Sequence, residues 1–120
     1  MIAAKNFCWR FSEIDWDGEF GWSKVSINDS AQIVIPKMHD YESMTWAEFD
    51  GPSGSHPVGI DQLCKEAQDR LKEIKMTHVE ALFSVRITGP KRVWGIKDVA
   101  ILRVLWWDPD HQVCPSLKNT

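Results

Sequence analysis

The feature that most constrains this chain is residues 82–107, where apolar and polar side chains repeat with the two-residue period of β-strands. Gly89-Pro90 and Asp98 interrupt the pattern and predict tight turns, so 92–97 and 99–107 form a second and a third strand. The third segment is apolar on both sides, as is typical of a central strand. The sequence therefore predicts a three-stranded antiparallel meander in the C-terminal half.

Upstream of the meander, the sequence predicts one more strand and a long helix. Asn6–Ser12 alternates with period two and is predicted to be a strand. Asp61–Met76 is predicted to be an amphipathic helix, because its apolar residues recur at helical spacing while the rest are polar. Those apolar residues are Leu63, Ala67, Leu71 and Ile74.

The region between them is expected to hold short elements. A helix is predicted over Pro36–Met44, since proline fits a first helical turn, and Thr45 with Glu48 matches a capping box. Asp50–Gly59 alternates proline and glycine with small polar residues and is predicted to be a surface loop. The order of elements predicts an α+β domain, with helices on one face of a single sheet.

The length of 120 residues suits a single domain spanning residues 1–120. Hydrophobic residues at 43% and charged residues at 26% are ordinary globular values, which argue against a disordered chain. No apolar run reaches the roughly 18 residues of a membrane span, and the first residues lack a signal-peptide layout, so we expect no membrane association and a cytoplasmic location. The three cysteines form no C-x-x-C pair and the histidines lack ligand spacing, so we expect no metal and no cofactor.

Charge is distributed unevenly along the chain. Residues 1–60 carry four basic residues against nine acids, whereas residues 81–107 carry five basic residues against one acid. The basic stretch is the part of the chain that would attract a phosphate-rich partner. The net charge of −3 argues against a protein that coats nucleic acid with its whole surface.

The C-terminal half resembles a known family. The segment Phe83–Trp94, FSVRITGPKRVW, is followed by an acidic turn, an apolar strand and a histidine. This order resembles the last three strands of the RelE/ParE toxin superfamily, in particular its YoeB-type members, with Arg92 and His111 19 residues apart. The resemblance covers roughly 60–112. The C-terminal run LWWDPDHQVCPS is also similar to a group of short uncharacterised bacterial proteins.

The resemblance implies a RelE/ParE-like fold and a toxin that cleaves messenger RNA on the ribosome and is neutralised by a cognate antitoxin. In such a reaction the ribose 2′-hydroxyl attacks the adjacent phosphate. Arg92 would stabilise the growing negative charge, and Arg86 would hold the RNA backbone. His111 would protonate the leaving oxygen, and Glu80 is the candidate general base by its position.

Further basic and aromatic residues are candidates for RNA binding. Lys91 and Arg103 belong to the basic stretch, and Trp107 could stack on a base. Two alternatives stay open. The arginines could form only the solvated face of a half-buried sheet, paired with helix acids such as Glu66 or Glu73. The chain could also be a noncatalytic interaction module of the same fold, such as a ParE-like topoisomerase poison, that binds proteins through its acidic, tryptophan-rich first half.

Overall fold

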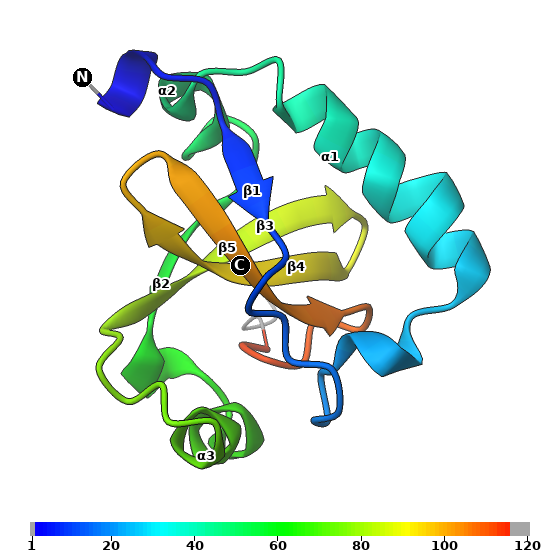
Figure 1. The fold of residues 1–120 in the computed structure, drawn as a ribbon, viewed down its shortest axis with the longest axis vertical. Coiled ribbons are helices and arrows are strands. Elements are labelled where there is room, and N and C mark those ends of the chain that lie inside the picture. The colour runs from blue at the N-terminus through cyan, green and yellow to red at the C-terminus, as the bar shows by residue number, and fades with distance from the viewer. Residues whose placement is uncertain (1, 116–120) are drawn as a thin grey trace.

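A mixed five-stranded sheet forms the centre of the computed structural model, which describes residues 2–115. The predicted meander is confirmed as β3 (Ala81–Thr88), β4 (Lys91–Asp98) and β5 (Ile101–Asp108). The strand order is β1-β5-β4-β3-β2, with β1 (Cys8–Arg10) parallel to β5 and β2 (His56–Gly59) antiparallel to β3 (Figure 1).

Short helices connect and cover these strands. The predicted capping box is confirmed at the start of α2, where the Thr45 side chain accepts a hydrogen bond from the Glu48 backbone and the Glu48 side chain accepts one from the Thr45 backbone. The helical segments are η1 (Ile2–Ala4), η2 (Trp22–Lys24), η3 (Asp29–Val34), α1 (Ile35–Tyr41), α2 (Trp46–Phe49), η4 (Ile60–Gln62) and α3 (Lys65–Glu73).

One local prediction is wrong, and another is confirmed with different bounds. The segment predicted as a surface loop, Asp50–Gly59, contains β2, because residues 56–59 pair with the edge of β3 and that long-range pairing outweighs the local proline and glycine signals. The long helix is shorter than Asp61–Met76. Cys64 is extended and precedes α3, while Lys75 takes a left-handed backbone with φ 61° just beyond its end.

Helices cover both faces of the sheet, not one face as predicted. One face, here called the α1 face, packs against α1 and α2. The opposite face, called the α3 face, packs against α3. The adjacent residues Trp106 and Trp107 show why, since they point to opposite faces and both are buried. A strand that is apolar on both sides needs a cover on each side.

Candidate functional site

Three charged residues form a row across one end of the sheet. Arg86 of β3 lies directly opposite Arg92 of β4, and Arg92 lies opposite Asp108 of β5. Residues directly opposite each other in antiparallel strands share a face, and their Cα atoms are about 5 Å apart. Trp94 lies two residues along β4 from Arg92 and belongs to the α3 face. The row, which we call the arginine row, is therefore on the α3 face.

The backbone of Arg86 is held in place beyond the point where β2 stops pairing with β3. The pairing of β2 with β3 ends at Ser84, so the backbone of Arg86 needs other partners. Its N–H donates to Ser55 Oγ at 2.9 Å, and its carbonyl accepts from the Tyr41 hydroxyl. Gly54 packs closely against the Arg86 side chain, since a Cβ added at Gly54 would lie only 2.9 Å from Cδ of Arg86. These contacts fix the main chain of Arg86 while the residue stays exposed.

Arg92 is half-buried and bent back onto the β3–β4 turn. Its Nη1 donates to the carbonyl oxygens of Gly89 at 2.7 Å and Lys91 at 3.0 Å. Burial lowers the pKa of Arg92, the positive charge of Arg86 lowers it further, and Asp108 acts in the opposite direction. A guanidinium has further donors on Nε and Nη2 and stays protonated in proteins. Two neighbouring cations of this kind favour an anion beside them.

Asp108 is a structural carboxylate that folds the chain back after β5. It is 1% exposed and accepts hydrogen bonds from Trp94 Nε1 at 3.1 Å and from the backbone N–H groups of Gln112 at 2.8 Å and Val113 at 3.0 Å. These hydrogen bonds close a turn that contains the half-buried His111, whose backbone is left-handed with φ 58°. The turn that carries His111 therefore starts at the strand position opposite Arg92.

The arginine row remains open to an anion. Within residues 2–115, no carboxylate is within ion-pair distance of Arg86 or Arg92. The helix acids considered as partners do not reach them, since Glu73 pairs with Arg70 of the same helix at 3.4 Å. The charge of Asp108 is shared among three hydrogen-bond donors and only partly offsets the two guanidinium groups.

Glu80, the expected general base, does not belong to this site. It precedes β3 by one residue, and its carbonyl oxygen accepts a hydrogen bond from the Ile60 N–H at 3.1 Å. Arg86 is six residues farther along the same strand, which corresponds to roughly 20 Å. Because Glu80 directly precedes β3 and Arg86 lies near its far end, Glu80 and the arginine row lie at opposite ends of the strand.

Lys91 and Trp107 lie on the other face. The Lys91 ammonium is 3.4 Å from Asp29 Oδ2 and 5.9 Å from the centre of the Trp107 ring. Trp107 is 2% exposed and stacks on Trp22 with ring centres 5.7 Å apart, so it has no open ring surface for a base. Lys91 directly precedes Arg92, and side chains of neighbouring strand residues point to opposite faces.

Arg103 faces a different cavity. It lies five residues before Asp108, roughly 16 Å along β5, and its guanidinium is 3.1 Å from Glu13 and 3.6 Å from Asp98. Together with Trp16 and His78 it lines a cavity of about 400 Å³. The structure thus brings Arg86, Arg92 and the His111 turn together, and places Glu80, Lys91, Arg103 and Trp107 elsewhere.

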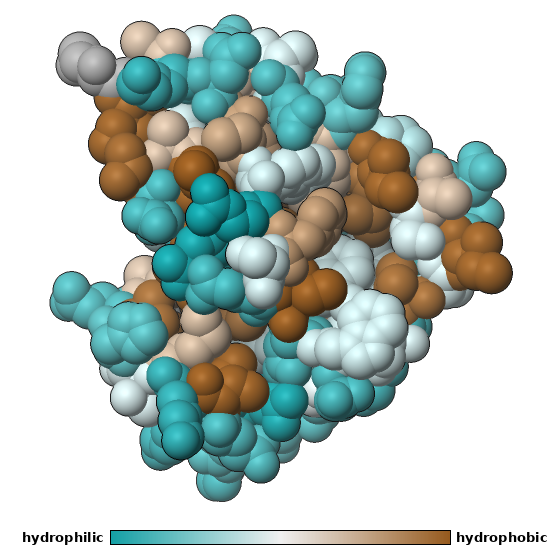
Figure 2. Space-filling view, in the orientation of Figure 1, coloured by the Kyte–Doolittle hydropathy of each residue, from teal (hydrophilic) through white to brown (hydrophobic). Residues whose placement is uncertain are grey.

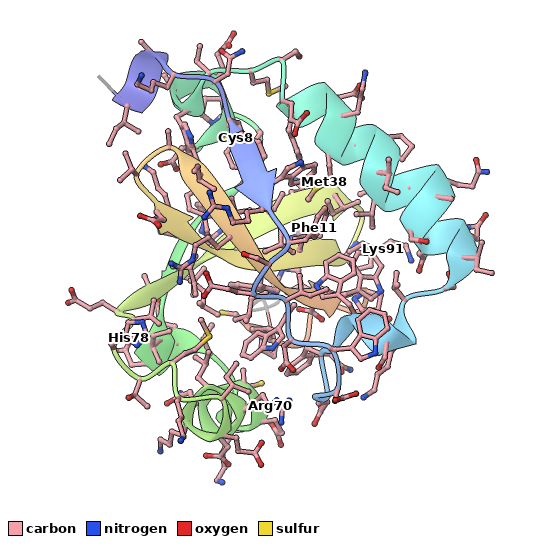
Figure 3. The ribbon with its side chains drawn as sticks, in the orientation of Figure 1. Cys8, Phe11, Met38, Arg70, His78 and Lys91 are labelled. Carbon is pink, nitrogen blue, oxygen red and sulfur yellow. The ribbon has the colours of Figure 1, made fainter. Side chains whose placement is uncertain are left out.

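An apolar groove lies between β1 and α1. It has a volume of about 330 Å³, and Phe11 and Ile35 on its border are 51% and 61% exposed. Figure 3 shows Phe11 and Met38 between the two elements, and Figure 2 shows apolar side chains exposed over and beside α1. The tryptophans of the first half contribute less to the surface than expected, since Trp22 and Trp46 are buried, Trp9 is partly buried, and Trp16 alone of the four is exposed.

Sequence reasoning missed the residues that position Arg86. Tyr41, Ser55 and Gly54 carry no local motif, and they reach Arg86 only because α1 and the loop before β2 pack against β3. Apart from the pattern of the strands themselves, the sequence held no signal for this long-range contact.

No family model, characterised protein or solved structure matches this chain. Within residues 2–115, no group of three or more histidine, cysteine, aspartate or glutamate side chains is arranged to hold a metal ion. In the same part of the chain, no helix is long and apolar enough to cross a membrane.

Proposed function

We propose that this chain is a ribosome-dependent messenger RNA endoribonuclease of the RelE/YoeB type, the toxin of a bacterial toxin–antitoxin pair. The observation that supports the proposal most strongly is the direct pairing of Arg86 with Arg92 on one face, beside the turn that carries His111. Among the described residues 2–115, the two guanidinium groups have no carboxylate ion pair, and they fit an RNA phosphate, which arginine binds in a bidentate manner.

The chemistry assigned to these residues is cleavage through the ribose itself. The 2′-hydroxyl gives up its proton to solvent water as its oxygen attacks the adjacent phosphorus, the bond from phosphorus to the 5′-oxygen breaks, and the 5′-oxygen takes up a proton. Negative charge grows on the nonbridging oxygens, where Arg92 stabilises it and Arg86 holds the neighbouring backbone. His111 donates the proton to the leaving oxygen as the general acid of the reaction.

The proposed site works without Glu80. A carboxylate roughly 20 Å from the arginine row cannot accept the proton of the 2′-hydroxyl. Asp108 is also unsuited to the role, because it is 1% exposed and accepts three hydrogen bonds. We therefore assign rate enhancement to charge stabilisation and the histidine acid, and expect slower cleavage than a site with a positioned base would give.

The test is induction of the wild-type chain in bacteria, with growth and primer extension on cellular messages as the two readouts. Arg92→Ala and His111→Ala should each abolish growth arrest and message cleavage. Arg10→Ala removes an exposed arginine from β1, far from the arginine row, and should leave both unchanged. Cleavage that persists in Arg92→Ala would contradict the proposal.

A noncatalytic interaction protein is the second candidate, and two observations favour it. The expected base Glu80 is displaced from the site, and the groove between β1 and α1 offers apolar surface to a protein partner. Growth arrest without RNA cleavage would support this candidate, particularly if Phe11→Asp in the groove relieved the arrest while Arg92→Ala did not. Absence of any growth arrest would count against both forms of toxin.

A further inference from the structure

Two cysteines that are 50 residues apart in sequence are brought close together by a backbone hydrogen bond at the start of α3. The N–H of Cys64 donates to the carbonyl of Val113 at 2.7 Å, and Cys114 is the next residue. A backbone hydrogen bond of this kind places the Cα atoms of Cys64 and Cys114 roughly 5–6 Å apart, within the separation that a disulfide spans.

Both side chains also belong to the same face of the sheet. Cys64 and Cys114 are partly buried and lie against the apolar cluster of the α3 face. The Cys114 thiol approaches the carbonyl oxygen of Gln62 at 3.4 Å, only two residues before Cys64. The third cysteine, Cys8, is exposed on β1 at the edge of the sheet and packs with neither.

We propose that Cys64 and Cys114 are a site of oxidative modification and form an intrachain disulfide in the folded protein. The oxidant class is a peroxide. One thiolate attacks a peroxide oxygen and breaks the O–O bond, giving a sulfenic acid and, with hydrogen peroxide, one water. The second thiolate attacks the sulfenic sulfur, forms the S–S bond and releases the oxygen as a second water. The two sulfur atoms together lose two electrons, and the peroxide gains them.

Burial sets the conditions for this reaction. It raises the pKa of both thiols, and the charge of Glu66 acts in the same direction on Cys64. Because the thiolate is the reactive form, oxidation is slow at neutral pH and accelerates as the pH rises. The exposed Cys8 should instead react with external thiol reagents without needing local opening.

The bond would fix the segment that carries His111. Asp108 holds this segment at one end and Cys114 lies at its other end, so a link to Cys64 closes the segment against α3. The expected result is a higher denaturation midpoint for the oxidised chain and slower amide exchange between residues 109 and 114.

The experiment exploits tryptic cleavage, which places the three cysteines in separate peptides, residues 6–10, 38–65 and 104–118. Wild-type protein and the Cys8→Ser variant are treated with hydrogen peroxide in the folded state, and parallel samples are treated in urea. Free thiols are then blocked, and the peptides are mapped by mass spectrometry without reduction. In the folded state we expect the 38–65 and 104–118 peptides to be joined and two hydrogens lighter than their sum. In urea, wild-type protein should give all three pairings.

Three results would overturn the proposal. One is that both thiols stay free in the folded state while Cys8 is oxidised. Another is that folded protein gives mainly pairings with Cys8. The third is that the Cys64–Cys114 link forms in urea but not in folded Cys8→Ser protein. Cys64→Ser and Cys114→Ser, checked for native near-ultraviolet dichroism, should each abolish the link and the rise in midpoint. This test reads out thiol chemistry and does not depend on the proposed nuclease activity.

Discussion

On the α1 face aromatic rings pack against aromatic rings, whereas on the α3 face tryptophan nitrogens donate hydrogen bonds to buried carboxylates. Phe49 lies against Phe7 and Phe83, with ring centres 4.1 and 5.5 Å apart. On the opposite face, Asp15 accepts from Trp106 Nε1 at 2.9 Å, and Asp108 accepts from Trp94 Nε1 at 3.1 Å.

This difference shows what each face does. Ring packing is nondirectional and holds helices in place by burial. A buried carboxylate positions the groups that donate hydrogen bonds to it, because each hydrogen bond has a preferred direction. Losing such a bond leaves the buried charge without a partner. The α3 face uses this to fix two irregular segments, the loop around Asp15 and the turn that carries His111. The candidate site therefore lies on the face where loops are fixed by hydrogen bonds.

The largest effect is expected from Phe49→Ala on the α1 face. Phe49 is fully buried and contacts several rings, so its removal should lower the free energy of unfolding by about 4 kcal/mol. The measurement is urea denaturation followed by tryptophan fluorescence. Phe11→Ala, at a 51% exposed position, is the control and should change little. Equal losses for both variants would contradict the core role of the α1 face.

Asp108→Ala comes next and affects the α3 face. Three donors lose their acceptor, and the variant should lose about 3 kcal/mol. Hydrogen exchange sharpens the comparison, because the amides of Gln112 and Val113 should exchange faster than the lower free energy of unfolding alone would explain. Asp110→Ala, two residues on and exposed, is the matched control and should leave both amides protected. Unchanged exchange in Asp108→Ala would show that the turn is held by other contacts.

The sequence predicted the strands well because their cause is local. The alternation around Val85 and the turn at Gly89-Pro90 are properties of adjacent residues, and β3, β4 and β5 begin and end within two residues of expectation. The same alternation already separates Lys91 from Arg92, since neighbours on a strand face opposite ways. Naming both residues as parts of one RNA site did not take that separation into account.

The parts that sequence reasoning could not reach depend on long-range contacts. Asp15 and Trp106 are 91 residues apart in the chain, and nothing near either residue indicates that they meet. Glu80 is the candidate base by its position before the first meander strand, whereas six residues of chain along β3 separate it from Arg86, the partner of Arg92. A carboxylate next to aromatic residues suggests a binding surface, but in Asp15 and Asp108 it is part of the core.

The next prediction concerns the ion pair that fixes the Asp15 loop. Arg70 of α3 donates to Asp15 at 2.8 and 2.9 Å, and Figure 3 shows it projecting from that helix. Arg70→Met should cost about 2 kcal/mol, since Asp15 keeps its Trp106 bond and Arg70 is 24% exposed. Lys65→Met breaks an exposed ion pair with Asp69 instead and should have no measurable effect.

The same pair predicts a pH dependence of stability. The hydrogen bonds from Arg70 hold the pKa of Asp15 below its usual value of 3.8, burial opposes them, and Trp106 adds to them. A carboxyl whose pKa is lower in the folded state stabilises the fold above its unfolded pKa, and this contribution disappears as the pH falls through the folded pKa. When the pH is lowered past about 4, the urea midpoint of wild type should therefore decrease, and that of Arg70→Met should decrease less. An identical acid dependence in both proteins would assign the effect to other carboxyls.

The smallest effect on stability is expected at the arginine row, where the largest effect on ligand binding should appear. Arg86→Gln and Arg92→Gln each remove one of two like charges, so the free energy of unfolding should change by no more than about 0.5 kcal/mol. Inorganic phosphate should raise the thermal midpoint of wild type, because a ligand that binds only the folded state stabilises it by mass action. Either variant should lose most of that rise, and Arg10→Gln should keep it. If all three variants respond to phosphate as wild type does, the stabilising anion binds elsewhere and the arginine row is only a solvated part of the α3 face.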